Sequence, residues 1–374
     1  MKIVHITTVH DPFDNRIFYK ECQSMVRMGH DVILVAEHEK DETVGGIRIR
    51  ALAKARGRLG RMLGTNFRAY RKARDEEADI YHFHDPEFIP LALVLKIRGK
   101  KRIIYDVHED YVSLIKIKAY LPRFLRAILA GFFNLFEKAL TKSFSKVLAE
   151  KYYRNRFPGG LTVLNYPDQE LLSITANNPS GRSDHKMRLI YTGNITADRG
   201  AFEHAAIVNY LEQALVYLTG KCDQELADKL YEAAGKNSGR LFINGKDRFV
   251  PFSEIKDYYA RGNWTAGLAL FPPNAHYINK ELTKFFEYMS AGIPVVCSDF
   301  PVWKKLIEET GTGLCVNSGD EEAIKSALEY LYLNPEEAKK MGRNGRKSVE
   351  KYFLWENEAL KLEQHYHDLM KEFR

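Results

Sequence analysis

The sequence predicts an α/β fold made of two doubly wound, Rossmann-like domains that face each other across a cleft. The first observation is that short apolar runs alternate with helix-length segments along the whole chain, a pattern typical of parallel sheets built from β-α-β units. The second is the length of 374 residues, which is more than one hydrophobic core usually serves. The third is a stretch at 165–186 that is rich in Pro, Asn, Ser and Gly and interrupts the alternation, as a linker does.

Ten segments are predicted to be strands, five on each side of this stretch. We therefore expect a first domain at 1–168, a linker at 169–186, a second domain at 187–350 and a final helix at 351–374. No fixed-period repeat is visible, which argues against a solenoid. The predicted strands are KIVHITT (2–8), DVILVA (31–36), DIYHFH (79–84), RIIYDV (102–107), KVLAE (146–150), MRLIYTG (187–193), ALVYLTG (214–220), RLFING (240–245), AGLALFP (266–272) and IPVVCSD (293–299).

The composition indicates the cellular location of the protein and the charge of its partner. No apolar run reaches the roughly 18 residues that span a bilayer, and the first residues lead directly into a strand rather than into a signal peptide. The four cysteines are scattered, which favours a reducing, cytoplasmic location. Residues 1–168 hold 30 Lys and Arg against 20 Asp and Glu, a net charge of +10, so the first domain is expected to meet an anionic partner.

The segment YHFHDPEF (81–88) places two histidines and two carboxylates at the carboxyl end of a strand, where open parallel sheets bind ligands. A spacing of two puts His82 and His84 on one face, which would suit a metal. However, the metallo-hydrolase pattern H-x-H-x-D-H requires Asp and His where this chain has Pro86 and Glu87. The sequence therefore predicts no metal, and it leaves open whether the histidines catalyse or only pack and cap the loop.

The first strand is followed by TTVHDPFDNRIFYKE, which contains no glycine, so a nucleotide is expected in the second domain. There, YTGNITADRGAFEHA (191–205) puts Arg199 at the start of a helix. The segment INKELTKFFEYMSAGIPVVCSD (278–299) puts Lys284 and Glu287 on one helix face. A helix N-terminus suits a diphosphate, and a carboxylate one turn further along could accept both ribose hydroxyls. The alternative interpretation is a surface ion pair.

Five segments resemble glycosyltransferase family four, a family of retaining GT-B glycosyltransferases, and together they span nearly the whole chain in the expected order. FFEYMSAGIPVVCSD is similar to the donor-binding E-A-M-A-x-G-x-P-V-V, and YTGNITADRG to Y-x-G-R-x-x-x-x-K-G. DIYHFHDPE is similar to the strand end D-x-x-H-x-H-D, and NRIFYKECQSMVRMGHDVILV to the first helix and second strand. SVEKYFLWENEALKLEQHYHDL resembles the last helices, which in the family cross back to the first domain.

The resemblance implies a retaining, metal-independent transfer from a nucleotide-sugar to a glycan or lipid-linked acceptor in cell-surface polysaccharide synthesis. The nucleotide-sugar is a substrate, and no cofactor is expected. Glu287 would bind the ribose, and Arg199 would take the place of the family's lysine on the diphosphate. By resemblance, Gly193, Asn194, Arg199, Thr283, Lys284, Phe285 and Glu287 bind the donor, the backbone of Arg248, Phe249 and Val250 meets the base, His84 and Asp85 are catalytic, and His10, Asp14, Arg16 and His108 face the acceptor.

Two departures from the family pattern affect this assignment. The family often has a second glutamate eight positions before Glu287, where this chain has Asn279. The diphosphate arginine that follows Y-x-G in the family is Asn194 here. The second departure leaves more of the phosphate charge to Arg199 and Lys284.

Residues 113–156 carry ten Lys and Arg against two carboxylates. Within them Leu121, Leu125, Ile128, Phe132 and Phe136 fall along one side of a helix. This helix either packs into the core or docks on anionic lipid. The second interpretation predicts peripheral contact with the inner face of the plasma membrane.

Two other functions were weighed against glycosyl transfer. A nucleotide-sugar 2-epimerase of GT-B fold would need no separate acceptor surface, and the basic first domain argues against it. A basic nucleic-acid-binding protein would be expected to carry a recognised module, and none is visible in the sequence.

Overall fold

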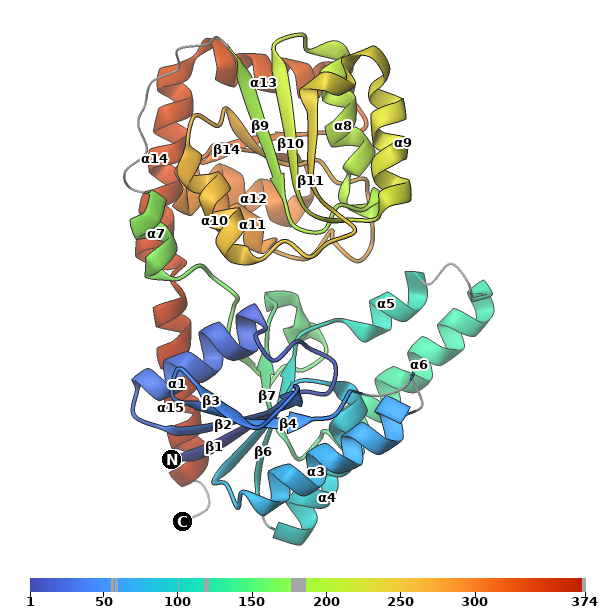
Figure 1. The fold of residues 1–374 in the computed structure, drawn as a ribbon, viewed down its shortest axis with the longest axis vertical. Helices are drawn as coiled ribbons and strands as arrows, with labels where there is room; N and C mark the ends of the chain where they lie inside the picture. The colour runs from blue at the N-terminus through green and yellow to red at the C-terminus, as the bar shows by residue number, and fades with distance from the viewer. Residues whose placement is uncertain (55–56, 58–59, 100, 118–120, 176–185, 372–374) are drawn as a thin grey trace. The chain divides into compact units, whose positions relative to one another are not determined.

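The computed structural model describes residues 1–54, 57, 60–99, 101–117, 121–175 and 186–371, and it divides into two compact units (Figure 1). Unit 1 comprises Met1–Asn165 with Trp355–Arg374, and unit 2 comprises Tyr166–Leu354. Each unit contains one sheet that is entirely parallel apart from the pair β3–β4. The predicted class, α/β with two doubly wound domains, is confirmed.

The sheet of unit 1 has the strand order β3-β4-β2-β1-β5-β6-β7-β8. The order reverses at β1, which pairs in parallel with both β2 and β5. Ligand sites in doubly wound sheets lie at the carboxyl ends of strands beside such a reversal. The strands are β1 (Lys2–Ile6), β2 (Asp31–Glu37), β3 (Glu42–Val44), β4 (Ile47–Leu52), β5 (Ile80–Phe83), β6 (Arg102–Val107), β7 (Ser145–Leu148) and β8 (Leu161–Thr162).

Helices cover both faces of this sheet and form two separate cores. One core packs the sheet against α3 and α4, and the other packs it against η1, α1 and the C-terminal helix α15. The chain therefore returns to unit 1 at its C-terminus (Figure 1). The helices are η1 (Asn15–Cys22), α1 (Gln23–Arg27), η2 (Gly60–Thr65), α3 (Asn66–Asp75), η3 (Pro86–Phe88), α4 (Ile89–Gly99), α5 (Tyr111–Ile117), α6 (Arg123–Leu140), η4 (Lys151–Asn155) and α15 (Trp355–Lys371).

The five strands predicted in the first domain are present, but the strands β3, β4 and β8 were missed. β3 and β4 form a hairpin in which Val44 pairs with Ile47. The two loop residues, Gly45 and Gly46, both have positive φ angles, 58° and 81°. Two-residue hairpin loops with such angles favour glycine, so the Gly-Gly pair was the available signal.

Unit 2 has the strand order β11-β10-β9-β12-β13-β14, all parallel. Because β-α-β crossovers are right-handed, α8 and α9 lie on one face and α10, α11 and α12 on the other (Figure 1). The strands are β9 (Met187–Thr192), β10 (Ala214–Cys222), β11 (Leu241–Lys246), β12 (Ala266–Ala269), β13 (Val295–Ser298) and β14 (Gly313–Val316). The helices are α7 (Gln169–Thr175), η5 (Ala197–Arg199), α8 (Ala201–Tyr210), α9 (Gln224–Ala234), η6 (Gly235–Arg240), α10 (Phe252–Arg261), α11 (Thr283–Ser290), α12 (Pro301–Thr310), α13 (Glu321–Leu333) and α14 (Pro335–Tyr352).

The linker predicted at 169–186 is wrong in its first part. Residues Gln169–Thr175 form α7, which packs on α10, α11 and α14 inside unit 2. Leu171 and Leu172 are buried there, so the last apolar residues before the polar stretch anchor a helix. The remainder of the predicted linker, 176–185, lies outside the described residues.

Candidate functional site

The carboxyl ends of three neighbouring strands bring the unit 1 residues together. β5 pairs in parallel with β1 on one side and with β6 on the other. His10 follows β1, His84 and Asp85 follow β5, and His108 follows β6. Residues from three distant segments of the sequence therefore meet at one edge of the sheet.

Three imidazoles form a chain of contacts at this edge. His5 Nδ1 lies 3.1 Å from His84 Nε2, and His84 Nδ1 lies 3.0 Å from His108 Nε2. His108 Nε2 also lies 2.7 Å from Asp106 Oδ2. Only 1% of His84 is exposed, and burial lowers its pKa well below the ordinary value. His84 is therefore buried behind His108. A residue that touches a donor sugar was expected to be accessible from the cleft, and His84 is not.

Asp85 is buried and holds the loop that follows β1. Its Oδ2 accepts hydrogen bonds from Thr7 Oγ1 at 2.8 Å and from the backbone N–H of Thr8 at 2.6 Å. Its Oδ1 lies 3.5 Å from His10 Nε2. Asp85 therefore holds the loop after β1 through Thr7 and Thr8, and the partly exposed side chain of His10 lies near its other oxygen without a hydrogen bond to it.

Arg16 does not face outward, contrary to the expectation that it meets an acceptor. Its guanidinium contacts Asp106 at 3.1 and 3.2 Å and Glu21 at 3.0 Å, and it donates to the Val163 carbonyl. A buried guanidinium needs such partners because an unpaired buried charge is costly. Asp14 caps η1 through hydrogen bonds from the N–H groups of residues 16 and 17, and its side chain stays partly exposed.

The two buried carboxyl groups of unit 1, Asp106 and Glu21, have pKa values that are shifted in opposite directions. Burial alone would raise the pKa of Asp106, but Arg16 and His108 lower it well below the usual value. Burial and the neighbouring Asp106 raise the pKa of Glu21 well above the usual value. Asp106, the more acidic of the two, therefore pairs with Arg16 as the carboxylate, while Glu21 holds its proton more tightly than an exposed glutamic acid does.

Four of these side chains could together hold a metal ion. Glu21, His82, His84 and Asp106 each place a ligand atom within 4.8 Å of the others. Both oxygens of Glu21 and the Nε2 atom of His82 have no hydrogen-bond partner among the described residues. A cation there would share the cluster with the guanidinium of Arg16, which already neutralises Asp106. The chemistry of the cluster thus fits a protein cation better than a metal ion.

The donor residues predicted in unit 2 surround the N-termini of two helices. α8 follows β9 and α11 follows β12, so both helices begin at the carboxyl edge of the sheet. Neither N-cap residue, Gly200 or Leu282, caps its helix with a side chain. Gly200 has φ +77°, and a Cβ there would lie 1.8 Å from the carbonyl oxygen of Leu270. Only glycine allows this close approach. The N–H of Ala201, the first residue of α8, donates to the Thr196 carbonyl at 3.2 Å, and no side chain of the N-cap residue covers the N–H groups that follow.

Lys284 is buried, so the alternative of a surface ion pair is wrong. Only 7% of Lys284 is exposed, and its Nζ lies 4.0 Å from the ring centroid of Tyr191 and 4.9 Å from that of Phe271. Burial, and then repulsion by Arg199, lowers the pKa of Lys284 well below the ordinary value. Gly193, with φ +103°, keeps the space beside this ammonium open, since a Cβ there would lie 3.7 Å from Nζ.

Arg199 and Glu287 are each held in place by a tyrosine. Arg199 Nε donates to the hydroxyl of Tyr277 at 3.0 Å, and that hydroxyl donates to Asp198 at 3.1 Å. The buried Tyr259 donates to Glu287 Oε2 at 2.7 Å. Two basic side chains and one carboxylate therefore lie beside the two helix N-termini. Thr283 and Asn194 are exposed at the same edge, whereas Phe285 is fully buried and supports α11 from within.

The segment predicted to meet the base follows β11 at this edge. Asp247, with φ +47°, turns the chain, and its backbone N–H donates to the Cys222 carbonyl. Arg248 pairs with Glu254 at 2.8 Å, and Val250 is buried. Between them, 78% of Phe249 is exposed, so the segment presents an aromatic ring as well as backbone groups.

Sequence reasoning missed the residues that position these groups. His5, Glu21 and Asp106 hold the histidine chain, and Tyr259 and Tyr277 orient the donor residues. His5 and Asp106 lie inside the apolar segments KIVHITT and RIIYDV, where a titratable residue in a buried strand was a usable signal. The sequence gives no such signal for Tyr259 and Tyr277, because these tyrosines meet their partners only in the folded chain.

The fold is that of a two-domain α/β protein with a doubly wound sheet in each unit and a polar cluster at the carboxyl edge of each sheet. Two family models match the chain, "Glycosyltransferase Family 4" over residues 15–150 and "Glycosyl transferases group 1" over residues 249–348. The chain belongs to the family-four type of GT-B glycosyltransferases, enzymes that use nucleotide-sugars.

Solved structures share this fold over nearly the whole chain. A sucrose-phosphate synthase from Thermosynechococcus elongatus has 17% identity and a TM-score of 0.76, covering 99% of each chain. A glycosyltransferase from Rickettsia africae has 12% identity and a TM-score of 0.75, covering 99% of this chain and 98% of that one. Anabaena HepE in complex with UDP-glucose has 11% identity and a TM-score of 0.72, covering 98% and 100%. At these identities the likeness shows the fold, and no curated protein sequence matches the chain.

Proposed function

We propose that this protein transfers a sugar, with retention of anomeric configuration, from a nucleotide-sugar bound by unit 2 to a glycan or lipid-linked acceptor in cell-surface polysaccharide synthesis. The observation that carries the proposal is the group of Arg199, Lys284 and Glu287 beside two uncapped helix N-termini. Cations and N–H groups suit the diphosphate, and a tyrosine-oriented carboxylate suits the ribose hydroxyls. HepE, which shares the fold, is described in complex with UDP-glucose, which supports a nucleotide-sugar donor.

The direct test is an assay of purified protein with a panel of nucleotide-sugars and membrane-extracted acceptors, run with and without EDTA. We expect acceptor-dependent transfer, unchanged by EDTA, and a product whose anomeric configuration matches that of the donor. Inversion in the product would contradict retention, and loss of activity restored by added metal would contradict metal independence. Epimerised sugar formed without acceptor would contradict the transferase assignment.

We also propose that the protein acts in the cytoplasm at the inner face of the plasma membrane, where residues 113–156 meet anionic lipid. The excess of Lys and Arg in that segment supports this contact. Residues 118–120 of the segment lie outside the described residues.

In unit 1, we propose that His108 is the histidine beside the reacting sugar and that His84 and Asp106 position it. His108 is the partly exposed end of the imidazole chain, and Asp106 contacts the same nitrogen that faces His84. Under this proposal His84 acts through His108 rather than on the sugar itself, and Asp85 acts by holding the loop after β1.

The expected result is that His108→Ala lowers kcat by about a hundredfold or more, as removal of a positioned catalytic group does. His84→Ala should lower kcat less, while His84→Gln, which can still hydrogen-bond, should recover part of the rate. Equal losses in His84→Ala and His108→Ala with unchanged donor affinity would show that His84 itself contacts the sugar. Steady-state kinetics at saturating donor provides the measurement.

The exposed ring of Phe249 is proposed to stack on the nucleotide base. Base–aromatic stacking contributes about 1–3 kcal/mol in nucleic-acid complexes, so Phe249→Ala should raise the Kd of the nucleoside diphosphate by about fivefold to a hundredfold. Phe242→Ala is the matched control, because Phe242 is an exposed phenylalanine on β11 that packs on Tyr217 instead. Calorimetric titration measures both, and equal affinities in the wild type and Phe249→Ala would remove the ring from the base site.

A further inference from the structure

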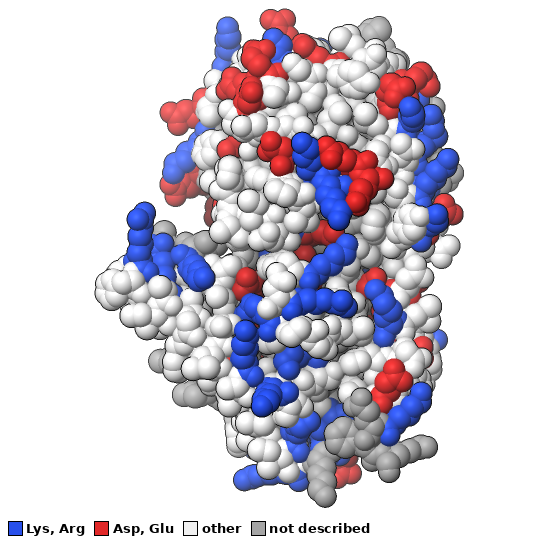
Figure 2. Space-filling model, turned by 180° about the vertical axis from the view of Figure 1, so that it is seen from behind, with Lys and Arg blue, Asp and Glu red and all other residues white. Residues whose placement is uncertain are grey.

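The outward face of α6 is apolar, unlike that of an ordinary surface helix. Phe124, Ile128, Phe132 and Leu135 are each more than 60% exposed. Their spacing of four, four and three residues puts them on one helix face. Figure 2 shows the α5–α6 part of unit 1, at the left, as mostly uncoloured surface with Lys and Arg at its margin. The alternative of a core-packed stripe is therefore wrong for Ile128 and Phe132.

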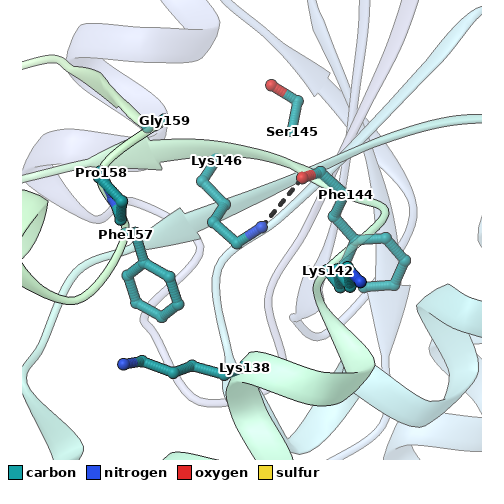
Figure 3. A pocket seen from close by; sticks show the side chains of 9 residues that line it. Lys138, Lys142, Phe144, Ser145, Lys146, Phe157, Pro158 and Gly159 are labelled. Carbon is teal, nitrogen blue, oxygen red and sulfur yellow. Dashed lines mark hydrogen bonds between the residues drawn. The ribbon is translucent and has the colours of Figure 1, made fainter.

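A pocket of about 350 Å³ lies at the C-terminal end of this apolar face. Lys138 comes from the last turn of α6, Lys142 from the turn that follows, and Lys146 from β7. Phe144 and the turn at 157–160 complete the lining. Figure 3 shows the ring of Phe157 between the side chains of Lys138 and Lys146. Cations and aromatic rings thus share one small cavity.

Two of the three lysines are available to an external anion. Within the described ranges, no carboxylate pairs with Lys138 or Lys142. Glu137, the nearest acid in sequence, is buried and accepts hydrogen bonds from Tyr105 and Arg156. Lys146 is engaged internally, since its Nζ donates to the carbonyls of Thr141 and Phe144.

The pocket is separate from the transfer site. Ser145 is the first residue of β7, and Gly160 directly precedes β8, so the pocket lies at the amino ends of these strands. The histidine chain lies at the carboxyl ends of β1, β5 and β6. α6 lies between the carboxyl end of β6 and the amino end of β7 in the chain, and its 18 residues extend for about 27 Å. Its apolar face therefore runs from the side of the transfer site toward the pocket.

We propose that this pocket binds the phosphate of an anionic lipid headgroup while the apolar face of α6 lies in the membrane interface, an inference that rests on the proposed membrane contact. Interfacial helices bury an apolar face at the headgroup boundary and gain affinity from flanking cations. Lys138 lies in the same angular sector of α6 as Phe124 and Leu135, so one orientation engages both lipid phosphate and acyl chains. No helix among the described residues has the length and apolar content to cross a bilayer.

The test is sedimentation of the full chain with vesicles of phosphatidylcholine alone or with one-quarter phosphatidylglycerol. The wild type should bind the anionic vesicles preferentially. Since each basic residue near an anionic surface contributes about fivefold in affinity, Lys138→Ala/Lys142→Ala should lose roughly 25-fold. Lys116→Ala/Arg123→Ala removes the same charge from α5 and the start of α6, and it should lose clearly less affinity than the pocket variant because neither residue lines the pocket.

The outcomes separate the pocket from the membrane contact. Equal losses of vesicle affinity in the two double variants would show a diffuse electrostatic attraction and would contradict a phosphate site in the pocket. Loss in Phe132→Ser with no loss in Lys138→Ala/Lys142→Ala would leave the α6 face as the docking site and likewise overturn the pocket. Equal wild-type binding to neutral and anionic vesicles would remove the membrane contact itself. Circular dichroism and thermal unfolding that match the wild type confirm that each variant folds, since a nucleotide bound by unit 2 would not report on unit 1.

Discussion

Replacing Arg199 with alanine is expected to lower kcat by about ten- to a hundred-fold. Hydrogen bonds to charged partners contribute about 1.5–3 kcal/mol, and 1.4 kcal/mol corresponds to a tenfold change in rate. The leaving diphosphate gains charge as the glycosidic bond breaks, so kcat should fall as well as the affinity for the donor. Arg199 is already oriented by Tyr277, which makes its loss costly at the transition state.

Lys284 adds a pH signature to the same experiment. Its pKa in the ligand-free protein is well below the ordinary value because the ammonium is buried and faces Arg199. A bound diphosphate brings negative charge that favours the protonated form, so binding should take up a proton. Titration calorimetry with a nucleoside diphosphate in two buffers of different ionisation enthalpy should detect this uptake in the wild type but not in Lys284→Met.

Lys246→Met is the control for these titrations, because Lys246 also lies over an aromatic ring, that of Tyr231, but on the surface. Glu287→Gln should weaken nucleoside diphosphate binding through the ribose while leaving proton uptake in place. If Arg199→Ala and Lys284→Met both bind nucleoside diphosphates as tightly as the wild type, the diphosphate lies elsewhere and the unit 2 site is wrongly assigned.

Acidification is expected to destabilise unit 1 strongly between pH 6.5 and about 4.5. Burial lowers the pKa of His5 to about 3, and it also lowers those of His82 and His84 well below their usual value. Below about pH 6.5 the unfolded chain therefore binds protons that the folded unit does not, and each such histidine costs about 1.4 kcal/mol per pH unit.

Two carboxylates modify this slope. Glu21, whose pKa is raised by burial, stays protonated in the folded unit and offsets about one histidine in that range. Asp106, whose pKa is lowered by Arg16 and His108, adds to the acid loss only below about pH 4. In that range the unfolded chain binds about two more protons than the folded unit, so the free energy of unfolding falls by about 3 kcal/mol for each pH unit of acidification. One such unit removes a large part of a typical domain stability of about 5–15 kcal/mol.

Hydrogen exchange of peptides from β1 and β5, measured at several pH values, reports this stability directly. His5→Gln should flatten the pH dependence by about one proton. His367→Gln, which changes an exposed histidine of α15, should leave it unchanged. If exchange in β1 and β5 is equally slow at pH 7 and pH 5, the buried histidines do not control the stability of unit 1.

The sequence by itself determined the elements and their class. Continuous apolar runs such as DVILVA and IPVVCSD became strands β2 and β13, which are buried on both faces, because apolar and β-branched content acts locally. The spacing of Lys284 and Glu287 placed both residues on one helix, α11, since helical periodicity is also a local property. That Lys284 is buried had no local signal. The Gly-Gly hairpin and the helix inside the predicted linker were missed, although each had a local signal in its glycines or leucines.

Only the tertiary structure decided which charges are buried and what each one contacts. Arg16 and Asp106 lie 90 residues apart, and they meet because β5 pairs in register with both β1 and β6. That register buries His84, leaves His108 partly exposed, and, by burying Glu21 near Asp106, raises the pKa of Glu21. Residue spacing fixes which face of an element a side chain occupies, but burial and charge depend on neighbours that the sheet supplies. The exposed phenylalanines of α6 have the same explanation. Only one face of the helix packs on the rest of unit 1, and the sequence alone does not show which face that is.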